Sequence, residues 1–142
     1  MPTSAERGFS TKVAAGLADT NPARLAYLDD CGVVKPSIQE AAGTGTARRW
    51  SERDCVLIRL ADELRRCGCF GPMLRSVLDD VGSRKNLDNL AVGVTRRGVA
   101  TVFAANAHPP AEAKTIVWVT AVAKEVADRA ARVRENARGG TA

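Results

Sequence analysis

The chain has 142 residues, 45% of them hydrophobic, and a net charge of +5 at pH 7. This size fits one domain or two very small ones, with enough apolar residues for a core. No apolar run approaches the roughly 18 residues of a membrane-spanning helix, and the N-terminal residues lack the hydrophobic stretch of a signal peptide, so we expect a cytoplasmic protein without a membrane partner.

Two helix starts are predicted near the N-terminus. Ser10 is a suitable N-cap for a helix that ends near Ala18. Asn21 caps a second helix, which Pro22 opens and which runs to about Cys31. Two short helices joined by a tight turn are typical of a helix-turn-helix.

A hairpin and two further helices are predicted next. The run Gly43–Thr46 is rich in glycine and threonine and predicts a hairpin tip. Ser51 caps a third helix, whose apolar residues recur at helical spacing as far as Gly68. Pro72 opens a fourth helix to about Asp80.

The pattern changes in the C-terminal part. Residues 90–105 hold two β-branched runs around Arg96-Arg97-Gly98, which predicts a β-hairpin. Residues 115–119 predict a third strand, which gives way to a helix over about 120–136.

Several of these segments share a sequence pattern with a known family. Residues 24–36 (RLAYLDDCGVVKP), 46–54 (TARRWSERD) and 54–78 fall in order on the conserved pieces of that pattern. The chain over roughly residues 9–80 therefore resembles the MerR-type winged helix-turn-helix DNA-binding family. The matching positions include Leu25, Tyr27, Gly32, Pro36, Arg48, Trp50, Ser51, Asp54, Leu64, Arg65, Gly68 and Leu78.

The resemblance, together with the strand and helix patterns after residue 90, predicts an α+β fold in two parts. Residues 9–82 are expected to form a MerR-like winged-helix DNA-binding domain, mainly helical with a two-stranded wing. Residues 90–137 are expected to form a small α+β region, a β-hairpin and strand followed by the C-terminal helix, for dimerisation or partner binding. A linker at about 81–89 separates them.

The resemblance also implies a DNA-contacting surface. In a winged helix, the helix that starts near Pro22 enters the major groove, with Asn21 and Arg24 at the end nearest the base edges. Arg24 is our candidate for direct readout, because a guanidinium can donate to guanine O6 and N7 together. Phosphate contacts are expected from Lys12, Tyr27, Lys35, Arg48 and Arg49.

Two residues depart from the family pattern. Ala26 stands where the family usually has a DNA-contacting arginine, and Ala47 where the wing usually has an aromatic residue. Two alternatives to a transcription regulator therefore stay open. One is a protein-interaction module on a winged-helix fold without DNA binding, and the other is a DNA-architectural or recombination-directionality factor.

The charge distribution bears on the partner. Residues 1–82 hold 11 Lys and Arg against 11 Asp and Glu, whereas residues 83–142 hold 10 against 5. The surplus favours nucleic acid as the partner. Either the cations of the N-terminal half cluster in space, or the C-terminal part also contacts double-stranded DNA. We also expect a homodimer, because two half-sites supply affinity that one small module lacks, and a protein partner of the C-terminal region stays open.

No constellation for catalysis or metal binding is visible. His108 lies in a proline-rich loop without a nearby carboxylate or serine, and Cys67-x-Cys69 has no second cysteine or histidine pair. We expect no enzymatic activity, no cofactor and no metal, with the cysteines reduced and packed as small apolar residues.

Overall fold

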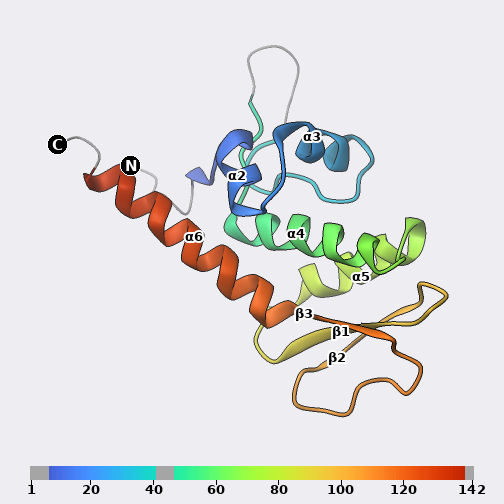
Figure 1. Cartoon of the computed structure of the whole chain (residues 1–142). Helices are drawn as coiled ribbons and strands as arrows, with labels where there is room; N and C mark the ends of the chain where they lie inside the picture. The colour runs from blue at the N-terminus through green and yellow to red at the C-terminus, as the bar shows by residue number, and fades with distance from the viewer. Residues whose placement is uncertain (1–6, 41–46, 140–142) are drawn as a thin grey trace. The chain divides into compact units, whose positions relative to one another are not determined.

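The computed structural model describes residues 7–40 and 47–139 (Figure 1). Within them, helices α2 to α5 precede a three-stranded antiparallel sheet, and the long helix α6 follows it. The α+β class predicted from the sequence is confirmed. The elements are α2 (Thr11–Leu17), α3 (Pro22–Asp30), α4 (Glu52–Arg66), α5 (Gly71–Ser83), β1 (Leu90–Val94), β2 (Ala100–Ala104), β3 (Thr115–Trp118) and α6 (Val119–Gly139).

The chain packs as two compact units. Unit 1 comprises the described residues up to Val56 and those from Lys124 onward, and unit 2 comprises Leu57–Ala123. Helices α4 and α6 each contribute residues to both units. The sequence predicted a division with other bounds, residues 9–82 and residues 90–137, and that division stays a prediction.

The first two helices of unit 1 begin at the predicted caps. Ser10 Oγ accepts from the Val13 N–H at 3.3 Å, and Asn21 Oδ1 accepts from the Arg24 N–H at 2.9 Å. Each bond satisfies an amide that the first helical turn leaves without a partner. Pro22 lies in the first turn of α3, as predicted.

Main-chain pairing joins distant parts of unit 1. Phe9 and Trp50 exchange N–H···O bonds of 2.7 and 2.9 Å, and Gln39 and Arg49 exchange bonds of 3.1 and 2.8 Å. The pairing of Gln39 with Arg49 is antiparallel, as the two sides of a hairpin require. The predicted hairpin tip at 43–46 lies outside the described residues.

The start of α4 is fixed by a carboxylate that is only 5% exposed. Asp54 Oδ2 accepts from the Ser51 N–H, the Ser37 N–H and the Ser37 hydroxyl, each at 2.8 Å. In return, the Asp54 N–H donates to Ser51 Oγ at 3.0 Å. Ser51 therefore caps α4 as predicted, and Asp54 ties the segment after α3 to the helix.

Unit 2 contains the sheet, in the order β2-β1-β3 with both pairings antiparallel (Figure 1). All five residues of the central strand β1 are buried. The predicted hairpin and third strand are confirmed, and α6 follows β3 directly. Thr120 in the first turn of α6 donates to the Leu87 carbonyl and accepts from the Leu90 N–H, both at 2.9 Å, so it connects the helix to the start of β1.

The turn between β1 and β2 requires glycine at residue 98. Gly98 has a φ of +81°, and a Cβ there would overlap the Gly68 carbonyl oxygen. We expect Gly98→Ala to lower the free energy of unfolding by at least about 1–3 kcal/mol, because a left-handed backbone and a main-chain overlap both disfavour it. Urea denaturation followed by circular dichroism measures this change.

Gly16 provides the matched control. It lies within α2, and a Cβ there would meet nothing within 4 Å. Gly16→Ala should therefore raise stability by about 0.5–1 kcal/mol. Equal effects of the two substitutions would contradict this description of the turn.

A bilayer-spanning helix needs about 20 mostly apolar residues. Among the helices of the described residues, none is long and apolar enough to cross a membrane.

Candidate nucleic-acid interface

Three of the predicted DNA-binding residues gather at the start of α3. Asn21 is exposed as the N-cap, and the Arg24 guanidinium carbon lies 5.3 Å from the centroid of the Tyr27 ring. Tyr27 is 52% exposed, whereas Leu25 and Leu28 on the same helix are buried. A cation–π contact restricts where the guanidinium lies. The exposed side of α3 thus presents a positioned guanidinium beside an aromatic hydroxyl.

Arg48 and Lys35 both bind the end of α3. The Asp29 carboxylate, in a residue only 8% exposed, accepts from Arg48 Nε at 2.6 Å and lies 3.3 Å from Lys35 Nζ. Arg48 also reaches Asp30 Oδ1 at 3.3 Å. These two cations are therefore partly neutralised by α3 itself.

Arg49 binds main-chain carbonyls instead. Its Nε donates to the Arg7 oxygen and its second terminal nitrogen to the Gly8 oxygen, both at 2.8 Å. Arg48 therefore fixes the segment that pairs with Gln39 to the end of α3, and Arg49 fixes it to the residues before Phe9. Replacing either one would disturb the hairpin as well as any phosphate contact, so such a variant does not separate the two roles.

Lys12 lies apart from the α3 group. It is exposed on α2 and lines a hollow of about 510 Å³ between α2 and α6. Arg129 and Arg132 of α6 line the same hollow, and Arg129 donates to the Leu17 carbonyl at 3.2 Å. Lys12 thus belongs to a basic surface that includes the C-terminal helix.

The C-terminal part of α6 lies in unit 1. The sequence predicted this helix as part of the region 90–137, and the residues from Lys124 onward pack within unit 1. The surplus of positive charge after residue 82 was the available signal, because part of that charge joins the unit that holds α3. The cations of α6 in unit 1 are Lys124, Arg129, Arg132, Arg134 and Arg138.

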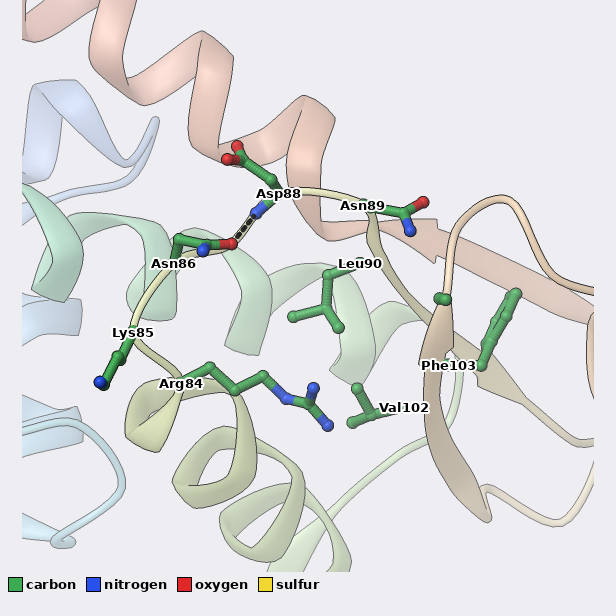
Figure 2. A pocket seen from close by; sticks show the side chains of 9 residues that line it. Arg84, Lys85, Asn86, Asp88, Asn89, Leu90, Val102 and Phe103 are labelled. Carbon is green, nitrogen blue, oxygen red and sulfur yellow. Dashed lines mark hydrogen bonds between the residues drawn. The ribbon is translucent and has the colours of Figure 1, made fainter.

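Two other basic pairs lie in unit 2. Arg84 and Lys85 line a hollow of about 470 Å³ together with apolar Val102 and Phe103 (Figure 2). Arg84 Nε lies 3.2 Å from Asp80 Oδ1 in an exposed ion pair. Arg96-Arg97 is exposed in the turn of the hairpin. All seven predicted DNA-binding residues, in contrast, belong to unit 1.

The four cysteines form no disulfide. Burial, with nearby Asp54 and Glu52, raises the pKa of Cys55 from 9.0 to about 12. Burial also raises the pKa of Cys67 and of Cys69, with smaller contributions from Glu63 and from Cys67 respectively. No group of three or more His, Cys, Asp or Glu side chains in the described ranges is arranged to hold a metal ion.

Thiol labelling tests this description. Cys31 is exposed, whereas Cys55 is buried and holds its proton near neutral pH. We expect a disulfide reagent at about pH 8 to modify Cys31 first and Cys55 only on unfolding, because the thiolate is the nucleophile. A Cys31→Ser variant should lose the fast phase. Fast labelling of Cys55 in the native protein would contradict the placement of α4.

No protein-family model matches this sequence, and no curated protein sequence matches it.

Proposed function

We propose that this chain is a sequence-specific DNA-binding transcription regulator with a MerR-like winged helix-turn-helix. Helix α3 enters the major groove, and the hairpin after it contacts phosphates as the wing. The observation that carries this proposal is the group at the start of α3, in which the half-buried Arg24 lies beside exposed Tyr27 and follows the exposed N-cap Asn21.

The order of elements in unit 1 supports the winged-helix assignment. Helices α2 and α3 are joined by the short segment 18–21, and α3 is followed by the antiparallel pairing of Gln39 with Arg49. Phe9 pairs with Trp50 beside that hairpin, and α4 follows. Helix, turn, helix and hairpin in this order are what a winged helix-turn-helix requires.

The geometry of α3 supports base contact. Arg24 has a fork of N–H donors that matches guanine O6 and N7. Its stacking on Tyr27 limits the side-chain entropy lost on binding. Asn21 and Tyr27, which are both exposed, supply an amide and a hydroxyl. Short polar residues around one arginine suit a helix end that contacts a few base pairs.

The phosphate contacts follow from the remaining cations. Lys12 and Lys35 are exposed, and each has an ammonium that can bind a phosphate oxygen. Arg48 and Arg49 use some of their N–H donors to fix the hairpin, and a guanidinium has five. Their remaining donors are assigned to phosphates beside the wing.

A second candidate function is a protein-interaction module on the same fold. The pairing of Arg48 with Asp29 and Asp30 favours it, because those carboxylates reduce the positive potential beside α3. Ala26 and Ala47, which depart from the family pattern, point the same way. This candidate predicts no affinity for any duplex.

Selection from a pool of random duplexes tests the proposal. We expect enrichment of a short motif that includes a G·C pair contacted by Arg24. A palindromic motif would support the homodimer that we propose, since two copies then contact two half-sites. Binding without enrichment would instead indicate an architectural protein, and failure to retain any duplex would indicate the interaction module.

A further inference from the structure

A second cationic site lies in unit 1, away from the residues assigned to base contact. It is a hollow of about 280 Å³, formed where the distal part of α6 meets the segment before α2 and the hairpin residue Arg49. Four arginines line it, and no lining residue is acidic. The lining consists of Arg7, Gly8, Phe9, Arg49, Val133, Arg134, Ala137 and Arg138.

The guanidiniums of Arg49 and Arg134 are held in place. Arg49 donates to the carbonyls of Arg7 and Gly8, which are neutral acceptors, so its positive charge is not cancelled. Arg134 lies with its guanidinium carbon 5.1 Å from the centroid of the Phe9 ring and donates to Glu52 at 3.1 Å. Glu52 therefore cancels the charge of Arg134, whereas Arg49 keeps its own.

Arg138 is the solvent-exposed arginine of the site. It lies one helical turn beyond Arg134, on the same side of α6. Its side chain is exposed and makes no hydrogen bond or ion pair with any residue that the structure describes. The negative end of the helix dipole favours one cation here. The helix dipole does not explain why arginines from three separate segments lie together.

We infer that this arginine hollow binds a phosphate group of the DNA backbone. The inference rests on the proposed function and extends the DNA contact to α6. Guanidinium forks match phosphate oxygens in pairs. Phe9 and Val133 give the hollow an apolar part, and a lower effective dielectric there strengthens the attraction.

The same site accounts for part of the surplus of positive charge in the C-terminal part of the chain. The surplus of positive charge lies after residue 82, although the predicted DNA-binding residues all precede residue 50. Helix α6 brings Arg134 and Arg138 into unit 1, beside Arg49. The C-terminal surplus is thus placed where it adds to the DNA-binding surface.

Salt-dependent binding of a mixed-sequence duplex tests the inference. Wild type, Arg138→Ala and Arg138→Lys are titrated onto a labelled duplex of about 20 base pairs across a series of KCl concentrations. We expect Arg138→Ala to weaken binding about 3- to 10-fold and to reduce the slope of log K against log salt by about 1. Arg138→Lys retains the charge and should retain most of the slope.

Lys124→Ala is the matched control. Lys124 is an exposed cation of the same helix, about 20 Å away along the axis. Binding within about 2-fold of wild type is expected for it, since it contacts no phosphate in this arrangement. A loss equal to that of Arg138→Ala would overturn the inference, because it would show only an effect of net charge.

Other outcomes distinguish the inference from the proposed function. Unchanged binding by Arg138→Ala, with weakened binding by Arg24→Ala, would overturn the site on α6 and leave the regulator intact. Failure of wild type to bind any duplex at low salt would overturn both. A free phosphate ion has the same chemistry, so inorganic phosphate is titrated separately while the Arg134 and Arg138 Nε–H signals are followed by NMR. Shifts with inorganic phosphate but none with the duplex would overturn the assignment to DNA.

Discussion

Trp50→Ala is expected to lower the free energy of unfolding by about 3–5 kcal/mol. The indole ring is fully buried, at 0% exposure, and its Nε1 donates to Thr11 Oγ1 at 3.0 Å. Removal of the ring leaves a cavity and a hydroxyl without its donor. The effect is large because Trp50 contacts α2 by its side chain and pairs with Phe9 by its main chain.

The chain offers a matched control for this substitution. Trp118 is 47% exposed at the end of β3 in unit 2, so Trp118→Ala should cost no more than about 1 kcal/mol. Urea denaturation followed by circular dichroism serves both variants. In Trp50→Ala the remaining tryptophan reports on unit 2 by fluorescence. If Trp50→Ala changed the free energy of unfolding by less than about 1 kcal/mol, the result would contradict the place of Trp50 in the core of unit 1.

Arg24→Ala is expected to weaken binding to a selected duplex about 10- to 100-fold, which corresponds to about 1–3 kcal/mol. The loss should be smaller on mixed-sequence DNA, because the guanidinium is assigned to a base edge. Arg24→Lys keeps the charge but loses the fork of donors. It should therefore retain mixed-sequence binding and lose discrimination at one base pair.

Arg66→Ala is the control for Arg24→Ala. Arg66 lies at the end of α4 in unit 2, with a side chain 69% exposed in a surface ion pair with Glu63. Its loss should leave DNA binding unchanged, because that pair has no assigned role in the interface. An equal loss for Arg24→Ala on every duplex would reassign Arg24 from base contact to phosphate contact.

Local features of the fold were predictable from the sequence. The caps at Ser10, Asn21 and Ser51 bind amides within three residues of themselves, so they depend on short-range geometry alone. The change from strand to helix near Trp118 was predictable for the same reason, since the side-chain period changes there.

Long-range contacts were not predictable in this way. Nothing near Arg48 or Arg49 indicates that one binds Asp29 and the other binds the carbonyls of Arg7 and Gly8. Those partners lie far away along the chain and meet only in the folded unit. The apolar stripe of α6 predicts that the helix is buried on one side, but not which unit covers it.

The candidate interface likewise has one part that was predictable from the sequence and one part that was not. Asn21, Arg24 and Tyr27 are neighbours on one helix, so the helical period alone places them together. The arginine hollow draws on three segments, and no pattern within any one of them indicates the others.

The central claim is that unit 1 binds double-stranded DNA, and fluorescence anisotropy of a labelled duplex with wild-type protein tests it most directly. Four cationic phosphate contacts, by Lys12, Lys35, Arg48 and Arg49, predict saturable binding with a salt slope near −3.6, or roughly 100-fold weaker binding between about 50 and 200 mM salt. A contact by Arg138 would steepen that slope further. Absence of binding to any duplex at low salt would contradict the account and favour the protein-interaction module.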